Sequence, residues 1–272
     1  MCRPASLVTV PLPPDLHVHT EWSYDGPHGS MDRSCERALE LGLPAIAFTD
    51  HADFVKVHDD QHCVDIAGYL ESIDRCRAKY SGLRILSGVE LGEPHWFPEE
   101  TADILAAGPL DIVLGSVHCI KVEGEIVDAS QFRERKGLDF AAATREYLAE
   151  VLAMVEGDQR FETLAHLDYP KRYWPDGGSP YREKDFEAEI RAVLSAAART
   201  GRVLEVNTTR GWILCPDITV VRWWREVGGQ AVQYASDAHD PDKIAAGFEL
   251  ATQMVEAAGF KPARDPVSLW RR

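Results

Sequence analysis

The chain has 272 residues with 45% hydrophobic composition, which suits one large domain over residues 1–272 of the size typical of α/β barrels. Its formal net charge of −15 disfavours a nucleic-acid polymer as a partner, because phosphate backbones attract basic surfaces. The chain has no run of about 18 or more apolar residues, and its start, MCRPASLVTVPLPP, is too short and too rich in proline for a secretory signal, so we expect a cytoplasmic protein without a membrane partner.

Segments of strand character alternate with segments of helical character along the chain. Apolar and β-branched residues predict seven strands: PDLHVHT (14–20), AIAFTDH (45–51), RILSGVE (84–90), DIVLGSVH (111–118), FETLAHLD (161–168), VLEVNTT (203–209) and AVQYASDAH (231–239). Helical patterns lie between or after them, at 31–42, 66–80, 98–108, about 139–155, 183–201, 218–229 and 241–259. Such alternation is typical of a parallel sheet, and units of this number and size favour a closed (β/α)7 barrel over an open sheet.

Residue types that bind metal ions stand at the ends of six of these strands. They are His17 with His19, then His51, Glu90, His118, His166, and Asp237 with His239, whereas the strand at 203–209 ends near Asn207. Barrels of this kind collect their active sites at the carboxyl ends of the strands, so we expect these side chains to converge. Because residues two apart on a strand point the same way, His17 and His19 can bind one ion together.

Each of these residues taken singly has a structural alternative. The HxH pair suits a solvated strand face, Asp50 suits a helix N-cap, and His166 suits a hydrogen-bonded buried histidine. The set as a whole favours a metal centre, and its imidazoles and carboxylates suit zinc, iron or manganese. The six cysteines form no CxxC motif and are expected to be reduced structural thiols.

The order of the motifs HxH, TDH, GVE, GSVH, HLD and SDAH resembles the polymerase and histidinol phosphatase (PHP) superfamily from Asp15 to about Gly247. HVHTEWSYDG, AHLDYPKRY and LEVNTTRG are most similar to its histidinol-phosphate phosphatase branch. The resemblance implies a distorted, TIM-like (β/α)7 barrel with three clustered divalent ions. It assigns His17, His19 and Asp237 to the first ion. Glu90 would bridge the first ion to a second ion held by His118 and His166, and the third ion would take Asp25, His51 and His239.

This resemblance predicts a metal-dependent phosphatase in which Glu90, Asp237 and His239 are catalytic. Clustered divalent ions can generate an ion-bound hydroxide and clamp phosphoryl oxygens, so we expect hydrolysis of a small phosphate ester. L-Histidinol phosphate, a substrate of histidine biosynthesis, is the leading candidate. A nucleotide-type monoester or diester is one alternative, and a non-catalytic, metal-binding regulatory barrel is another.

Basic residues just past two strand ends are candidates to bind the phosphate. Arg172 and Arg210 present guanidinium groups suited to a phosphoryl group, with Lys171 as the alternative to Arg172. Two segments depart from the family pattern. One is LGEPHWFPEE (91–100), where Glu93 and His95 are candidates to shape the pocket, and the other is VEGEIVDASQF (122–132).

Overall fold

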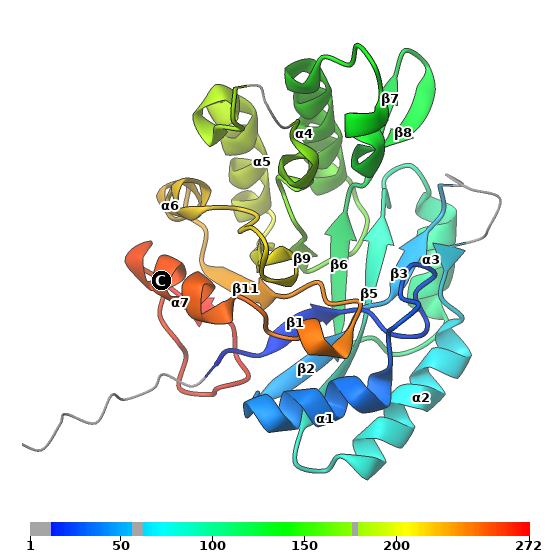
Figure 1. Ribbon diagram of the computed structural model, residues 1–272. Coiled ribbons are helices and arrows are strands. Elements are labelled where there is room, and N and C mark those ends of the chain that lie inside the picture. The colour runs from blue at the N-terminus through cyan, green and yellow to red at the C-terminus, as the bar shows by residue number, and fades with distance from the viewer. Residues whose placement is uncertain (1–11, 56–61, 176–178) are drawn as a thin grey trace, which may run out of the picture.

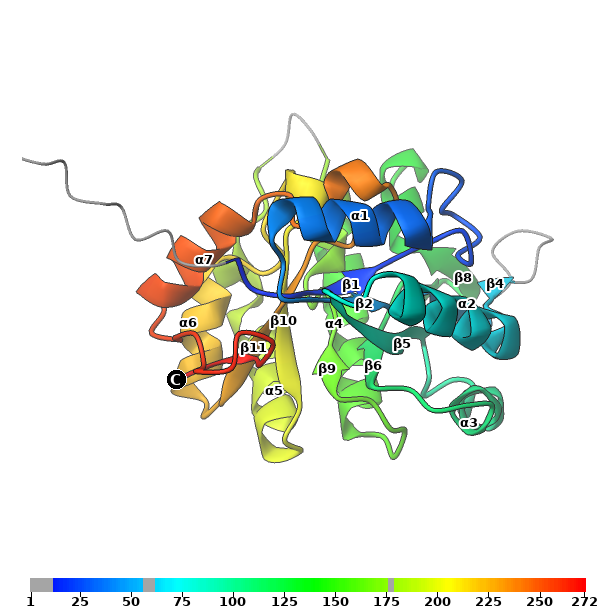
Figure 2. The same ribbon diagram turned by 90° about the horizontal axis from the view of Figure 1, so that it is seen from below.

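The computed structural model describes residues 12–55, 62–175 and 179–272, and Figures 1 and 2 show it from two directions. Within these ranges, parallel strands pair side by side in the order in which they occur in the chain. They are β1 (Asp15–Val18), β2 (Ala45–Phe48), β5 (Arg84–Gly92), β6 (Ile112–Ser116), β9 (Thr163–Leu164), β10 (Val203–Asn207) and β11 (Ala231–Ala235). All seven strands predicted from the sequence are present.

Contacts between the first and last of these strands close the sheet. Val18 and Ala238 form a parallel bridge, and the amide of His19 donates to the carbonyl of Ala238 at 2.8 Å. The amide of Asp237 donates in the other direction, to the carbonyl of His17, at 2.9 Å. The barrel is distorted, because β9 pairs with each neighbour through only two residue pairs. The predicted (β/α)7 fold class is therefore confirmed.

Helices cover the outer side of the barrel (Figure 2). They are α1 (Met31–Leu41), α2 (Ile66–Lys79), α3 (Pro98–Ala106), α4 (Phe140–Glu156), α5 (Glu187–Arg199), α6 (Ile218–Glu226) and α7 (Phe248–Ala257). Local sequence explains both ends of α1. Ser30 accepts a hydrogen bond from the amide of Arg33 and caps α1, which ends at Gly42 in the left-handed conformation with φ 68°. None of the helices in the described ranges combines the length and the apolar character needed to cross a membrane.

Two predicted helices begin later than expected. The segment at 241–259 forms a short 3-10 turn, and α7 starts only at Phe248, because Ala245 and Gly247 have φ values of 53° and 80° outside the right-handed helical region. The segment at 183–201 likewise opens with a 3-10 turn before α5. The sequence did not predict the strands β3 (His51–Asp53), β4 (His62–Cys63), β7 (Cys119–Val122), β8 (Glu125–Asp128) and β12 (Trp270–Arg271).

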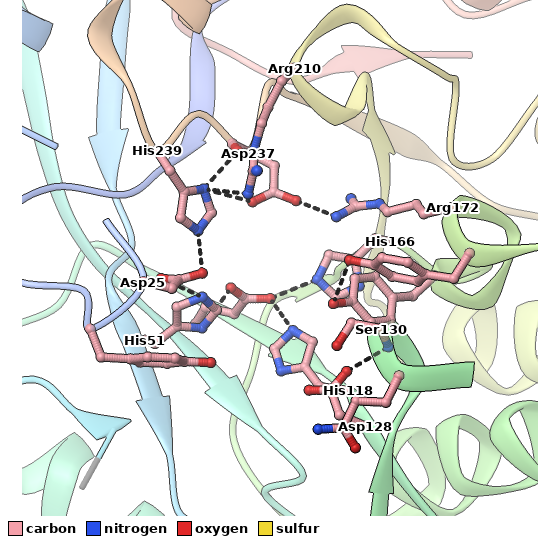
Figure 3. Close-up of a pocket in the computed structure, with 15 residues that line it drawn as sticks. Asp25, His51, His118, Asp128, Ser130, His166, Arg172, Arg210, Asp237 and His239 are labelled. Atoms are coloured by element: carbon pink, nitrogen blue, oxygen red, sulfur yellow. Dashed lines mark hydrogen bonds and ion pairs between the residues drawn. The ribbon is translucent and has the colours of Figure 1, made fainter. Parts of the chain in front are cut away.

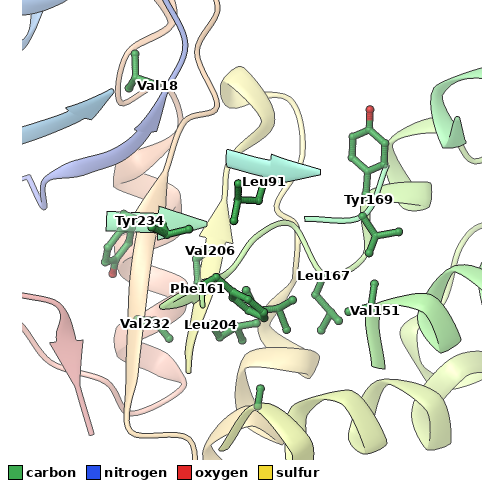
Figure 4. Close-up of a cluster of buried hydrophobic side chains, with 14 of the residues drawn as sticks. Val18, Leu91, Val151, Phe161, Leu167, Tyr169, Leu204, Val206, Val232 and Tyr234 are labelled. Atoms are coloured by element: carbon green, nitrogen blue, oxygen red, sulfur yellow. The ribbon is translucent and has the colours of Figure 1, made fainter. Parts of the chain in front are cut away.

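The hydrophobic core fixes the barrel strands against the helices. Figure 4 shows Phe161 packed near Leu204 and Val206 of β10, with Leu167 beside them. A Cβ atom added at Gly115 of β6 would lie 2.7 Å from two atoms of the Phe161 ring, so only glycine leaves room for that ring. This packing holds the strand ends that carry the polar residues in fixed relative positions.

Candidate metal centre

The polar strand ends meet around one cavity of about 310 Å³ (Figure 3). Its lining includes seven of the nine predicted metal ligands, namely Asp25, His51, Glu90, His118, His166, Asp237 and His239. The other two, His17 and His19, are 0% and 1% exposed and contact Glu90 from within the barrel. The site therefore collects all nine residues from seven separated segments of the chain.

Glu90 occupies the centre of this site at the carboxyl side of β5. Its Oε2 lies 3.1 Å from Nε2 of His17 and 3.2 Å from Nδ1 of His51. Its Oε1 lies 3.3 Å from Nε2 of His118 and 2.7 Å from Nε2 of His166. The two oxygens thus face two different sets of imidazoles, as a carboxylate that bridges two ions would require.

His17 and His19 point their Nε2 atoms at each other, 3.0 Å apart. The Nδ1 of His17 is 2.8 Å from the carboxylate of Glu205, which can only accept a hydrogen bond, so Nδ1 is the donor. The Nδ1 of His19 is 2.9 Å from Oγ of Ser23, and the hydroxyl of Ser23 donates to Asp50. In the neutral rings, both Nε2 atoms consequently carry lone pairs, and a cation between them would relieve the repulsion. The donor set and its orientation fit a divalent ion.

Asp237 completes the group around this histidine pair. Its Oδ1 lies 3.4 Å from Nε2 of His19 and 3.9 Å from Nε2 of His17. The ligand atoms of His17, His19 and Asp237 all lie within 4.8 Å of one another. This is the group that the resemblance assigns to the first ion.

A second group of ligand atoms gathers around Asp25 at the mouth of the cavity. One carboxylate oxygen of Asp25 is 2.8 Å from Nε2 of His239, and the other is 3.6 Å from Nε2 of His51. The ring of His19 stacks against both imidazoles, with centroids 4.3 Å from His51 and 4.1 Å from His239. The structure thus brings the predicted third set together and adds His19 to it.

The remaining group differs in one member from the predicted second set. Ligand atoms of His51, Glu90 and His118 lie within 4.8 Å of one another. His166 is not part of that group, although its Nε2 touches the same Glu90 oxygen that faces His118. His51 therefore stands between two groups, with one ring nitrogen directed at each.

The electrostatics of the site favour positive charge. Burial alone would raise the pKa of Glu90, but the imidazoles of His17 and His51 hold it well below its usual range. Burial would lower the pKa of His17, but Glu205 and Glu90 raise it well above its usual value. Buried carboxylates at this density require compensating cations, which protons on imidazoles or divalent ions can provide.

The two predicted arginine anchors both line the cavity, whereas Lys171 does not. Arg172 donates from Nη1 to Oδ2 of Asp237 at 2.7 Å. Arg210 places Nη2 at 2.8 Å from Nδ1 of His239 and donates from Nε to the carbonyl of Asp237 at 3.1 Å. Lys171 instead binds Glu183 at 2.8 Å and the carbonyl of Leu214 at 3.0 Å.

Several supporting residues escaped the sequence analysis. Glu205 is fully buried on β10, where it also accepts from the amide of His166 at 3.0 Å and from the side chain of Asn207 at 2.8 Å. Strand alternation could have revealed it, since it lies two residues before Asn207 and shares its face. Asp50 is not a helix N-cap, because it accepts from the amide of Thr20 at 2.7 Å and from Ser23 at 2.7 Å.

The segment at 91–100 supports the site from outside the cavity. Glu93 is buried and accepts from the amide of Cys119 at 2.7 Å, which holds the turn after His118 in place. His95 contacts Glu150 of α4 at 2.9 Å. Neither Glu93 nor His95 is among the residues that line the described cavity.

Comparison with known proteins places these features in a family context. A model of the PHP domain matches residues 15–209. The histidinol-phosphatase of Lactococcus lactis is 28% identical over 259 residues, covering 90% of this chain and 91% of that protein. The DNA polymerase/3'-5' exonuclease PolX of Bacillus subtilis is 26% identical over 194 residues, covering 71% of this chain but only 28% of PolX.

A solved structure shares the fold along almost the whole chain. It is the histidinol phosphate phosphatase of Lactococcus lactis, crystallised with Zn, L-histidinol and phosphate. The TM-score is 0.81 at 23% sequence identity, and the match covers 92% of this chain and 94% of that one.

Proposed function

The chain belongs to the PHP domain family and is a metal-dependent hydrolase, and from this premise we propose that it is a phosphomonoesterase that hydrolyses L-histidinol phosphate to histidinol and phosphate. The reaction joins a water oxygen to phosphorus and breaks the bond from phosphorus to the alcohol oxygen. The main support for this reaction is that one cavity holds the clustered imidazoles and carboxylates together with two guanidinium groups.

The hydrogen bonds of Arg172 support a bound phosphoryl group. Its side chain is only 8% exposed, and its Nε and Nη2 atoms have no hydrogen-bond partner within the described ranges. Buried guanidinium donors without partners are costly, and a phosphoryl group offers acceptors in the matching forked geometry. Arg172 also stays beside the predicted ions, because its Nη1 binds Asp237.

Arg210 supplies a second donor on the same side. A histidine that binds an ion through Nε2 carries its proton on Nδ1. In His239, this Nδ1–H group would donate a hydrogen bond to the carbonyl of Asp237, which lies 3.0 Å away. The Nη2 of Arg210 would then lose Nδ1 as an acceptor and would be available to a phosphoryl oxygen. Both arginines would thereby hold the phosphate and stabilise the charge that develops during its transfer.

Divalent ions bound to the nine predicted ligands would supply a water of lowered pKa and positive charge for the phosphoryl oxygens. The residues of the chain orient that chemistry. Glu90 holds the two sets of imidazoles on either side of one carboxylate. Glu205 fixes the orientation of His17, and Ser23 with Asp50 fixes that of His19.

A nucleotide-type phosphate ester is the second candidate, because the similarity to PolX extends over 71% of the chain. A non-catalytic regulatory barrel is not supported, since the family match and the similar proteins point to a hydrolase.

A panel of phosphate esters tests the proposal directly. The protein is reconstituted with zinc, iron or manganese, and kcat/KM is measured for L-histidinol phosphate, a nucleoside monophosphate and bis(p-nitrophenyl) phosphate. We expect the highest kcat/KM for L-histidinol phosphate. A higher value for the nucleotide or the diester would replace the proposed substrate, and no turnover of any phosphate ester by the ion-loaded protein would overturn the proposed reaction.

A further inference from the structure

The two ends of the cavity carry side chains of opposite charge. Arg172 and Arg210 lie on one side of the predicted ligands, and Asp128 and Ser130 lie on the opposite side, next to His118 (Figure 3). A phosphate held by the two guanidinium groups would therefore direct the organic part of its ester toward Asp128.

The hairpin formed by β7 and β8 brings Asp128 to this position. β7 and β8 pair antiparallel, with Cys119 opposite Asp128. The amide of Ala129 donates to the carbonyl of His118 at 2.8 Å. The hairpin thus leaves the barrel directly after His118, turns at Glu123–Gly124 and returns Asp128 to the rim of the cavity.

The carboxylate of Asp128 differs from the other carboxylates that line the cavity. Asp25, Glu90 and Asp237 each face at least one imidazole within 3.6 Å. Asp128 accepts from the amide of Ser130 through Oδ1 at 2.6 Å, and in the described part of the chain no histidine, lysine or arginine forms an ion pair with it. It is a half-buried carboxylate that faces the cavity and has no cationic partner among residues 12–55, 62–175 and 179–272.

Aromatic side chains also line the cavity that Asp128 faces. Tyr24 and Tyr169 both line the cavity, and Tyr169 packs edge-on against His118 with a centroid distance of 5.3 Å. Burial raises the pKa of Tyr169 well above its usual value, and the nearby charge of Asp128 adds to this effect. The buried ring of Tyr169 lowers the local polarity and strengthens a charge pair formed with Asp128.

We propose that Asp128 is a specificity-determining residue that binds a protonated amine of the substrate, so that the cavity selects phosphomonoesters of amino alcohols. This inference rests on the proposed function, since it assumes that a phosphomonoester occupies the cavity. The free carboxylate oxygen accepts a charge-assisted hydrogen bond from the ammonium group, while the phosphate is held at the arginine end.

Matched pairs of esters with and without the amine test the inference. One pair is L-histidinol phosphate and 3-(imidazol-4-yl)propyl phosphate, and the other is 2-aminoethyl phosphate and ethyl phosphate. The measured quantity is the amine preference, defined as kcat/KM for the amine ester divided by kcat/KM for its partner. The ion-loaded protein is compared with Asp128→Asn, which retains an oxygen to accept from the amide of Ser130.

We expect the amine preference to fall about 10- to 100-fold in Asp128→Asn, mainly through KM, as for a lost hydrogen bond to a charged group. Asp139→Asn is the matched control, because Asp139 also accepts backbone amides, those of Ala141 and Ala142, at the start of α4 but does not line this cavity. It should keep the parental amine preference.

Each other outcome has a distinct meaning. An unchanged amine preference in Asp128→Asn, an equal fall in Asp139→Asn, or a parent protein that prefers the esters without an amine would overturn the inference and leave the phosphomonoesterase proposal standing. A preference for 2-aminoethyl phosphate without hydrolysis of L-histidinol phosphate would support the inference and overturn the proposed substrate. No hydrolysis of any of the four esters would overturn both.

Discussion

Replacement of Glu90 by glutamine removes one charge from the centre of the site and leaves its shape almost unchanged. In the structure, the carboxylate is 1% exposed, and its oxygens lie 2.7–3.4 Å from nitrogens of five histidines. An amide offers one oxygen in place of two and directs an NH2 group at imidazole nitrogens that need to face an ion. The variant therefore cannot bridge two sets of ligands.

The expected magnitude follows from that geometry. Two unit charges about 4 Å apart interact by about 4 kcal/mol at the effective dielectric constant of about 20 that suits protein sites. A loss of this size in the transition state lowers kcat/KM by about 10³-fold. Because Glu90 contributes to two sets of ligands, we also expect a lower ion content than in the parent protein.

The assay combines elemental analysis of the reconstituted protein with kcat/KM for L-histidinol phosphate. Glu99→Gln is the matched control, because Glu99 is exposed in the first turn of α3 and should change neither quantity. Thermal unfolding followed by circular dichroism verifies that the variant is folded. Parental ion content and parental turnover in folded Glu90→Gln would refute the assignment of Glu90 as a bridging ligand.

The remaining predictions concern the anchors, the ions and the scaffold. Arg172→Ala and Arg210→Ala should each lower kcat/KM by about 10- to 1000-fold with unchanged ion content, and parental kinetics in both would place the phosphate elsewhere. Glu205→Gln should weaken ion affinity about 10- to 100-fold in a competition titration with a chelator, because Glu205 orients His17 at 2.8 Å. Chelation of the divalent ions should abolish turnover, and adding them back should restore it; activity that survives exhaustive chelation would contradict the metal-dependent mechanism. Asp15→Ala should lower the free energy of unfolding by about 3 kcal/mol in urea titrations, because buried Asp15 accepts hydrogen bonds from the amides of Ser236 and Ala245 at 2.9 Å each. A change below about 1 kcal/mol would show that water replaces the carboxylate.

The strand pattern carried most of the information about the fold. Parallel barrel strands are buried on both sides, so they read as short apolar runs such as AIAF and IVLGS, and each is followed by a helical pattern. The direction of each strand then decides which end of it contributes to the site. For this reason, the positions of His51, Glu90 and His118 at one end of the barrel followed from the sequence before any contact was known.

Strand and helix periodicity did not predict the conformations of the loops. Lys171 and Arg172 are neighbours in one 3-10 turn, and only the structure shows that Arg172 faces Asp237 while Lys171 faces Glu183. The start of α7 depends on the positive φ values near Gly247, which no hydrophobic pattern reports. The hairpin that carries Asp128 also escaped prediction, because the charged residues Lys121, Glu123 and Glu125 interrupt its apolar pattern.

The sequence by itself determined the family, the order of the strands and the residue types at their carboxyl ends, because these depend on local periodicity and on the direction of the chain. Only the tertiary structure decided which side chains share a partner. His17 meets Glu205 across 188 positions of sequence, and this contact exists because the barrel closes through the bridge between Val18 and Ala238. Closure brings β1 and β11 together although they are far apart in the sequence, where no local propensity acts. The orientation of His17 and the grouping of the ligands around Glu90 are therefore properties of the closed barrel and not of any one segment.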